Sequence, residues 1–233
     1  MKVVILAGGL GTRLSEYTKT IPKPMISVNG LPIIFRIMSF YAKYGFKDFY
    51  IALGYKGEII RNFFKKNNYG WNINLINTGK KTMTGGRLKR LTKYLGKDTF
   101  MMTYGDGLSD VNLKKLLNFH KKNKKLVTLT VVRPPARFGY LKLKGNSVKY
   151  FKEKSNVDEG WINGGFFVME PKFLKYIKND KTYLERNPLE ILTKKKQLSA
   201  FKHKDFWHCM DTMRDKKNLE KILLQKKYKK IFS

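Results

Sequence analysis

The sequence is poor in cysteine, histidine and long apolar runs. Its single cysteine, Cys209, cannot form a disulfide within the chain, so we expect a protein of the reducing cytoplasm. The three histidines show no metal-ligand spacing with Cys209, and no nucleophile motif surrounds it, so we interpret this thiol as a small apolar filler. No apolar run is long enough to span a bilayer, and the apolar start of the chain is too short for a signal peptide, so we expect no membrane partner.

Acidic residues are also scarce. Asp and Glu number 17 against 49 Lys and Arg, which gives a formal net charge of +32. A charge of this size is compatible with nucleic-acid binding through phosphate contacts. The lysines, however, are spread along the whole chain, with no recognition motif and no basic stripe interleaved with aromatics. We therefore favour a lysine-rich solvated surface that steers small anionic substrates inward, and we expect no specific nucleic-acid partner.

Apolar runs alternate with amphipathic stretches through the first half of the chain. Buried strands are predicted at 2–8, 48–54, 72–78, 99–107 and 126–132, and helices at 31–45, 57–66, 85–95 and 110–123. Strands separated by helices of this size imply right-handed crossovers and a mostly parallel sheet. The pattern therefore predicts an α/β, Rossmann-like fold with helices flanking the sheet on both faces.

The alternation of apolar runs and amphipathic stretches ends at about residue 133. Residues 139–154 alternate apolar and polar side chains, as a solvent-facing hairpin does, with Gly145-Asn146 as its turn. A buried strand follows at 162–170, then a helix, a strand at 198–203 and one basic terminal helix. With no linker or repeat, we expect one domain over residues 1–233 whose second half adds a small β-ribbon.

The stretch LAGGLGTRL (6–14) follows a buried strand, so its three glycines lie at the carboxyl edge of the sheet. Glycines there let backbone N–H groups approach an anion closely. The stretch lacks the third small residue of the dinucleotide fingerprint and the Gly-Lys-Ser/Thr of the P-loop. Instead Arg13 follows the glycines, and Lys23 lies between two prolines that restrict its backbone. This combination indicates a different kind of phosphate-binding loop.

Two acids occupy comparable positions later in the chain. Asp106 follows a strand in YGDG, and Asp211 precedes the last helix in CMDT. Two carboxylates at the mouth of a parallel sheet are suited to a hard divalent cation such as Mg²⁺. Aspartate is equally common in turns and helix caps, so the residues alone leave both interpretations open.

Two further segments are candidates for ligand contact. In INGG, two glycines interrupt an otherwise buried strand, which suggests close approach of a ligand or of another backbone. Thr84 precedes two glycines and a helix, so ordinary capping by its hydroxyl is one interpretation. Trp161 and Trp207 are interpreted as packing residues.

These motifs together resemble those of the sugar-1-phosphate nucleotidyltransferases, the NDP-sugar pyrophosphorylases. The stretch at 77–90, NTGKKTMTGGRLKR, is most similar to the glucose-1-phosphate cytidylyltransferase branch. The matching stretches run in order through LAGGLGTRL, PKPM, YGDG (104–107), FGYL (138–141), FKEK (151–154), INGGFFV (162–168) and FWHCMDTMRDK (206–216).

The resemblance implies a nucleotide-diphospho-sugar transferase fold, with a nucleotide-binding half at 1–132 and a sugar-phosphate-binding half at 133–233. The implied reaction transfers the cytidylyl group of CTP to a sugar 1-phosphate, glucose 1-phosphate first among the candidates, giving a CDP-sugar and pyrophosphate. The attacking phosphate oxygen is already ionised, so the reaction requires neither a general base nor an enzyme nucleophile.

The resemblance also implies residue roles. Arg13, Lys23, Asp106 and Asp211 are the implied catalytic residues, and the two aspartates are the implied Mg²⁺ ligands. Nucleotide contacts are implied for Leu6, Ala7, Gly8, Gly9, Gly11, Thr12, Arg13, Lys23, Thr84, Gly85, Gly86, Arg87 and Gly105. Contacts to the sugar phosphate are implied for Tyr104, Gly139, Glu153, Lys154, Asn163 and Gly164.

Several alternatives stay open. The same reaction with UTP or dTTP, or with another phosphorylated acceptor, is one, and a non-catalytic nucleotide-sugar-binding regulator is another. The segment after the GYKG helix is shorter than in the cytidylyltransferases, so their assembly cannot be carried over, although a homo-oligomer remains an option. Ser155 replaces the proline that usually follows the Glu-Lys pair, and Tyr140 follows Phe138-Gly139, so the acceptor sugar is also left open.

Overall fold

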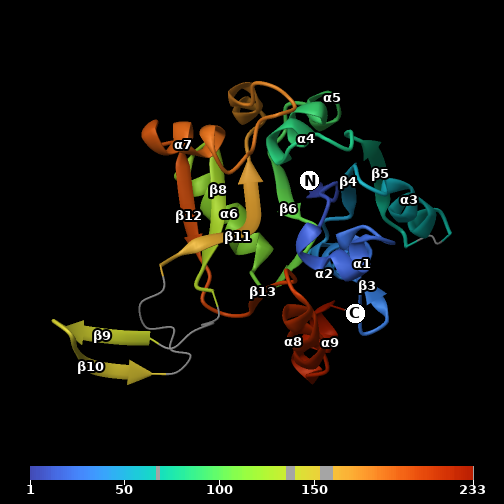
Figure 1. Cartoon of the computed structure of the whole chain (residues 1–233). Coiled ribbons are helices and arrows are strands. Elements are labelled where there is room, and N and C mark those ends of the chain that lie inside the picture. The colour runs from blue at the N-terminus through green and yellow to red at the C-terminus, as the bar shows by residue number, and fades with distance from the viewer. Residues whose placement is uncertain (67–68, 135–139, 153–159, 233) are drawn as a thin grey trace.

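A seven-stranded sheet forms the centre of the protein (Figure 1). The computed structural model describes residues 1–66, 69–134, 140–152 and 160–232. The strands, in spatial order, are β12 (Leu198–Lys202), β8 (Val127–Val132), β11 (Ile162–Met169), β6 (Phe100–Tyr104), β1 (Lys2–Leu6), β4 (Asp48–Leu53) and β5 (Asn72–Asn77).

Most neighbouring strands are parallel, as the sequence predicts. β1 pairs in parallel with β4 and β6, β4 pairs in parallel with β5, and β12 pairs in parallel with β8. β11 is the exception, because it runs antiparallel to both β6 and β8. Leu6 and Tyr104 are register partners at the carboxyl ends of β1 and β6. The loops that follow these two strands therefore begin at one edge of the sheet.

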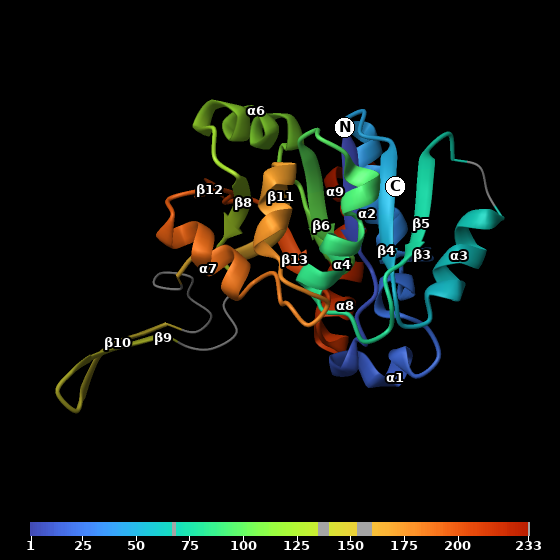
Figure 2. The same cartoon turned by 90° about the horizontal axis from the view of Figure 1, so that it is seen from above.

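Helices cover both faces of this sheet (Figure 2). Val3 and Ile5 of β1 belong to one hydrophobic cluster and Val4 and Leu6 to the other, as expected when alternate side chains point to opposite faces. The first cluster draws on α2 (Ile33–Lys43), α3 (Gly57–Lys65), α6 (Leu113–Asn123), α8 (Met213–Leu223) and α9 (Lys226–Phe232). The second draws on α4 (Thr84–Arg90), α5 (Thr92–Leu95), the 3₁₀ helix η3 (Pro171–Tyr176) and α7 (Asn187–Lys194).

Short elements complete the edge where the loops gather. The 3₁₀ helix η1 (Thr12–Leu14), α1 (Ser15–Thr18), the 3₁₀ helix η2 (Lys23–Met25) and the pair β2 (Ser27–Val28) and β3 (Leu31–Pro32) follow β1. β7 (Gly107–Ser109) pairs antiparallel with β13 (Trp207–Cys209). This small pairing joins two segments about a hundred residues apart in the chain.

The predicted ribbon is present. β9 (Tyr140–Lys144) and β10 (Ser147–Lys152) form an antiparallel pair that stands away from the sheet in both views (Figures 1 and 2). Gly145 in its turn has φ of 57°, a left-handed conformation that favours glycine. Leu143 and Phe151 on the ribbon are exposed.

Two sequence predictions need correction in detail. The helix predicted at 85–95 is divided into α4 and α5, and the single basic terminal helix is divided into α8 and α9. Among the helices of the described residues, none is both long and apolar enough to cross a membrane.

Candidate active site

A cavity of about 600 Å³ opens where the loops after β1 and β6 meet. Sixteen of the residues predicted to bind nucleotide, sugar phosphate or metal lie on its wall. They are Leu6, Ala7, Gly8, Gly9, Gly11, Thr12, Arg13, Lys23, Thr84, Arg87, Tyr104, Gly105, Asp106, Asn163, Gly164 and Asp211. The structure therefore gathers segments from both halves of the chain around one space.

Four charged side chains meet at one end of this cavity. The Nζ atom of Lys23 donates hydrogen bonds to Asp106 Oδ2 at 2.6 Å and to Asp211 Oδ1 at 2.7 Å. Arg13 Nη1 donates to Asp211 Oδ2 at 2.5 Å. The Lys23 side chain is 10% exposed, whereas that of Arg13 is 70% exposed. We call Arg13, Lys23, Asp106 and Asp211 the charge cluster.

Local structure explains how these four residues meet. Lys23 begins η2, immediately after the extended Pro22. The β7–β13 pairing brings Asp106 and Asp211 together, and the Met210 N–H donates to the Asp106 carbonyl at 2.9 Å. Residues remote in sequence thus reach one point through a short antiparallel pairing.

Helix capping does not account for Asp211. The side chain of Thr212 caps α8, and Asp215 completes a capping box with it. The Asp211 carboxylate instead accepts hydrogen bonds from Lys23 and Arg13. The capping interpretation of this aspartate is therefore wrong.

The charges within the cluster shift one another's protonation. Burial acts to lower the pKa of Lys23, but Asp106 and Asp211 outweigh burial and hold it above its ordinary value. Burial acts to raise the pKa of Asp211, but Lys23 and Arg13 outweigh burial and hold it below its ordinary value. Lys23 and Asp211 therefore carry full charge at neutral pH.

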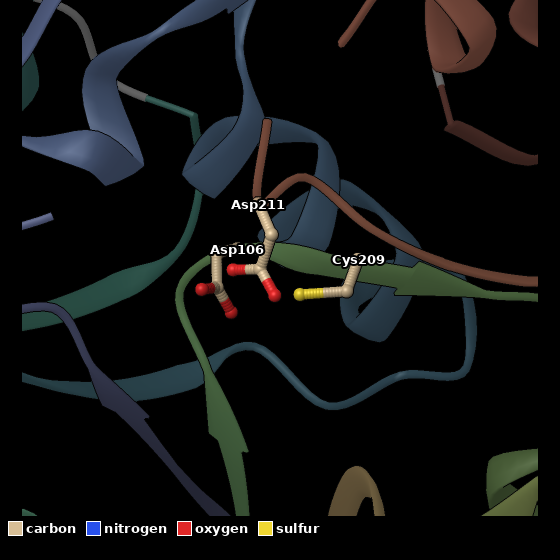
Figure 3. A group of neighbouring side chains, drawn as sticks. All are labelled: Asp106, Cys209 and Asp211. Atoms are coloured by element: carbon tan, nitrogen blue, oxygen red, sulfur yellow. The ribbon is translucent and has the colours of Figure 1, made fainter. Parts of the chain in front are cut away.

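The two carboxylates fit a divalent cation. Figure 3 shows the two carboxylates side by side, with the Cys209 sulfur beside Asp211. One donor atom from each of Asp106, Cys209 and Asp211 lies within 4.8 Å of the others. The carboxylates already bind one cation, the Lys23 ammonium. Their oxygens are the ligand type that Mg²⁺ prefers, whereas burial raises the pKa of the Cys209 thiol and disfavours its thiolate.

Cys209 is not the apolar filler that we expected. It is half-buried and lies on the cavity wall beside the two acids. Trp207, from the same strand, also lines the cavity, and its Nε1 donates to the Gly164 carbonyl at 2.7 Å.

The glycine-rich loop has two different requirements for glycine. A Cβ atom at Gly8 would lie 2.2 Å from Arg87 Nη1, so any side chain here would displace the Arg87 guanidinium from its contacts. Gly11 has φ of 67°, in the left-handed region. A Cβ at Gly9 would meet no atom within 4 Å. Only Gly9 therefore lacks a structural reason to be glycine.

Arg87 lies beneath this loop and is 4% exposed. Nη2 donates to the Gly8 carbonyl at 2.8 Å, and Nη1 donates to the Gly79 carbonyl at 2.7 Å and to Thr78 Oγ1 at 2.8 Å. Nη1 also donates to the Leu53 carbonyl at 3.2 Å. These contacts join the ends of three segments that follow strands β1, β4 and β5.

Arg87 has no acidic partner among the residues that the structure describes. Burial, with Arg90 nearby, lowers the pKa of Arg87 to about 10, so the guanidinium stays protonated at neutral pH. Its contacts make it a support of the loop from beneath as well as a residue of the cavity wall.

The glycines after Thr84 pack against another segment. A Cβ at Gly85 would lie 2.8 Å from the Thr182 carbonyl oxygen, and one at Gly86 would lie 2.5 Å from Asp180 Cα. Both are buried and neither lines the cavity. Close packing against 180–184 accounts for this glycine pair.

Thr84 does not cap α4 as the ordinary interpretation expects, because the helix has no side-chain cap. Its hydroxyl accepts from the Leu184 N–H at 2.9 Å and donates to Glu185 Oε2 at 2.7 Å. Tyr104 donates to Glu185 Oε1 at 2.6 Å, and Asn163 Nδ2 lies 3.4 Å from the Tyr104 hydroxyl. Burial, with Glu185 beside it, holds the pKa of Tyr104 well above its ordinary value, so the phenol is neutral.

Glu185 is a cavity residue that the sequence did not reveal. It follows no recognisable motif and lies in a loop far along the chain from Thr84 and Tyr104. Its contact with both hydroxyls becomes visible only once 180–185 is packed against α4. Gly139, Glu153 and Lys154 lie outside the described residues.

Trp207 also lines a second cavity, of about 790 Å³. Arg133, Trp161, Lys202 and Lys204 are among its lining residues. It contains none of the residues predicted to bind nucleotide, sugar phosphate or metal. The chemistry predicted from the sequence therefore belongs to the first cavity.

Comparison with known proteins bears on the same segments. A family model described as nucleotidyl transferase matches residues 2–213. The glucose-1-phosphate cytidylyltransferase of Salmonella typhimurium is 45% identical over 243 residues, which cover 94% of this chain and 95% of that protein. The probable glucose-1-phosphate cytidylyltransferase of Bacillus subtilis is 38% identical, over 95% of this chain and 96% of that protein.

The fold is likewise similar to solved structures. A crystal structure of HddC from Yersinia pseudotuberculosis, complexed with GMP-PN, superposes with a TM-score of 0.76 at 27% identity. The match covers 95% of this chain and 99% of that chain. These similarities confirm both the fold predicted from the sequence and the resemblance on which the residue roles depend.

Proposed function

Because this chain belongs to the nucleotidyl transferase family and is a nucleotidyltransferase, we propose that it transfers the cytidylyl group of CTP to a sugar 1-phosphate. The acceptor that we propose is glucose 1-phosphate, and the products are CDP-glucose and pyrophosphate. Similarity to two cytidylyltransferases over nearly the whole chain supports this choice of nucleotide and sugar. We also propose a cytoplasmic enzyme, as the single cysteine suggests.

The observation on which the proposal chiefly rests is the charge cluster. Its two aspartates are paired with its lysine and its arginine, and the nitrogen and oxygen atoms of each pair lie within 2.7 Å of each other. Such groups can exchange their partners for a metal ion and for phosphates without leaving a buried charge unpaired. A cavity with both kinds of charge at one end is suited to a nucleoside triphosphate and its cation.

In the proposed reaction, a phosphate oxygen of the sugar 1-phosphate attacks the α-phosphorus of CTP. A new P–O bond forms as the bond to the β-phosphate oxygen breaks, and pyrophosphate leaves with that electron pair. The main obstacle is repulsion between two polyanions. Asp106 and Asp211 would hold Mg²⁺, and when bound this ion supplies positive charge that reduces the repulsion.

The basic residues have complementary roles in this proposal. Lys23 would bind phosphate oxygens near the α-phosphorus, and the exposed Arg13 would bind the departing pyrophosphate. Gly9 and Gly11 offer backbone N–H groups to the same phosphates. The four charges and the loop thus orient the triphosphate and stabilise the charge that develops as pyrophosphate leaves.

The rest of the cavity wall would bind the base and the sugar. Thr84 and Arg87 lie on the proposed base side, and Tyr104, Asn163 and Gly164 on the proposed sugar side. Glu185 lies between them, hydrogen-bonded to Thr84 and Tyr104. Lys154, by resemblance, would bind the phosphate of the sugar. Gly85 and Gly86 support the wall from behind by their close packing.

A panel of substrates tests the proposal. Purified protein is incubated with Mg²⁺, each of CTP, UTP, dTTP, ATP and GTP, and each of several sugar 1-phosphates, and pyrophosphate is followed. We expect the highest kcat/KM with CTP and glucose 1-phosphate. A preference for UTP or dTTP would replace the nucleotide assignment, and a preference for another sugar would replace the acceptor. Nucleotide-sugar binding with no pyrophosphate from any pair would indicate the non-catalytic regulator.

A further inference from the structure

The Lys23 ammonium lies between the carboxylates of Asp106 and Asp211, the two residues that would hold a shared metal ion. Its nitrogen atom is 2.6 Å from one carboxylate and 2.7 Å from the other. The side chain is 10% exposed, and those of the aspartates are 25% and 17% exposed. The position between the carboxylates therefore already contains one positive charge.

This arrangement satisfies two carboxylates that would otherwise repel each other. Arg13 contacts only Asp211, from the exposed side, and so cannot replace Lys23 between the two acids. An ammonium on a flexible four-carbon side chain can move to another anion, but leaving it buried without one is unfavourable. Lys23 thus stabilises the ligand-free site and competes with any cation that enters it.

We propose that Lys23 is the resident counter-ion of Asp106 and Asp211, and that it makes divalent metal and triphosphate bind together. This inference rests on the proposed function, because it assigns the triphosphate as the anion that receives the lysine. A metal ion alone must displace the ammonium while offering it no new partner. A triphosphate that arrives alone is repelled by the two negatively charged carboxylates. When both arrive, the metal replaces the ammonium between the carboxylates, and the ammonium moves onto the phosphates.

The test is Mn²⁺ binding without nucleotide, measured by titration calorimetry and by the electron paramagnetic resonance signal of free Mn²⁺. Wild-type protein is compared with Lys23→Met, Lys23→Arg and Lys19→Met, the last an exposed lysine in the neighbouring loop. Because removing a competing buried cation frees both carboxylates, we expect Lys23→Met to bind Mn²⁺ at least about tenfold more tightly. Lys23→Arg and Lys19→Met are expected to bind it as weakly as wild type.

A thermal-unfolding measurement tests the proposal even if Lys23→Met folds poorly. Mn²⁺ is expected to raise its unfolding temperature more than that of wild type, because a ligand stabilises the state that it binds. A variant that folds only when Mn²⁺ is added supports the proposal equally. Unchanged Mn²⁺ affinity in folded Lys23→Met would overturn it, and so would an unfolded variant that Mn²⁺ does not restore.

Failure of this inference is distinguishable from failure of the proposed function. The Mn²⁺ titration needs no substrate, whereas the substrate panel uses only wild-type protein and Mg²⁺. Pyrophosphate release from CTP by wild type, with no effect of Lys23→Met on Mn²⁺ affinity, would leave the function intact and remove the counter-ion role.

Discussion

Two parts of the cavity wall use positive charge in opposite ways. In the charge cluster, Lys23 and Arg13 are paired with carboxylates. Beneath the glycine-rich loop, the buried Arg87 donates to the Gly8 and Gly79 carbonyls and to the Thr78 hydroxyl, all of them neutral oxygens. The first arrangement can exchange partners with a ligand, because each charge meets another charge that a ligand can replace. The second holds three segments of backbone together and has no such exchange.

This difference predicts that the charge cluster governs the chemical reaction, whereas Arg87 governs the stability of the fold. The sequence does not distinguish the two kinds of residue, because arginine beside a glycine-rich motif is equally compatible with both. The structure distinguishes them by the atoms that accept their hydrogen bonds: carboxylate oxygens for Lys23 and Arg13, and neutral oxygens for the buried Arg87. Each of the following variants tests one side of the comparison.

The largest effect is expected for Asp106→Ala and Asp211→Ala. Losing a preorganised group that stabilises developing charge slows a reaction by about a hundred- to a thousandfold, and we expect at least this loss in pyrophosphate release. Each variant leaves Lys23 one carboxylate partner, so circular dichroism is expected to show a folded protein. Asp98→Ala, an exposed acid in a loop, is the matched control. Near-normal turnover in either site variant would remove the metal assignment.

Arg87→Met tests the structural role of Arg87. It leaves several buried carbonyl oxygens without donors, and we expect the free energy of unfolding to fall by about 3 kcal/mol. Urea denaturation measures this loss. Arg90→Met is the matched control, because Arg90 is paired with Asp180 at the surface, where an ion pair contributes about 1 kcal/mol or less. Equal stability of the two variants would contradict the structural role of Arg87.

Glu185→Gln tests whether Glu185, which joins Thr84 and Tyr104 on the cavity wall, contributes to substrate binding. The amide keeps one acceptor oxygen, so one of the bonds from Thr84 and Tyr104 is lost. A hydrogen bond to a charged group contributes enough that we expect kcat/KM to fall about tenfold. Steady-state kinetics with each substrate varied in turn measures the change, and Glu190→Gln on α7 serves as control. Unchanged kinetics would exclude Glu185 from the site.

The smallest effect is on stability at low pH. The pKa of Asp211 is lower in the folded protein than in the unfolded chain, where it is about 3.8. The ionised Asp211 side chain therefore contributes fully to the free energy of unfolding above this unfolded pKa. That contribution is lost as pH falls through the lower pKa of the folded protein. Wild type should therefore lose stability relative to Asp211→Asn below about pH 4, by about 1 kcal/mol or less. Urea denaturation from pH 6 to pH 3 measures this, and a constant difference over that range would contradict it.

The sequence predicted the features that depend on local patterns. The strands that end at Leu6 and Tyr104 were predicted because apolar runs and glycine turns are local signals. Asp106 and Asp211 were placed together by resemblance, and the β7–β13 pairing supplies the physical reason. The antiparallel direction of β11 was not predicted, because strand direction depends on connections across the whole sheet.

Other features depend on packing between distant segments. Glu185 reaches the cavity only because 180–185 packs against Gly85 and Gly86, and no local pattern encodes that contact. Arg87 was predicted to contact the nucleotide, and the structure adds that its guanidinium donates to the carbonyls of Gly8, Leu53 and Gly79. Cys209 was interpreted as filler because the spacing of potential ligands along the chain did not reveal its two acidic neighbours.

The most direct test of the account is a crystal structure with Mn²⁺ and a non-hydrolysable CTP analogue. We expect an anomalous Mn²⁺ peak at Asp106, Asp211 and the triphosphate, with Lys23 moved from the carboxylates onto the phosphates. A bound nucleotide with no ion between the two carboxylates, and with Lys23 still paired to both, would contradict it.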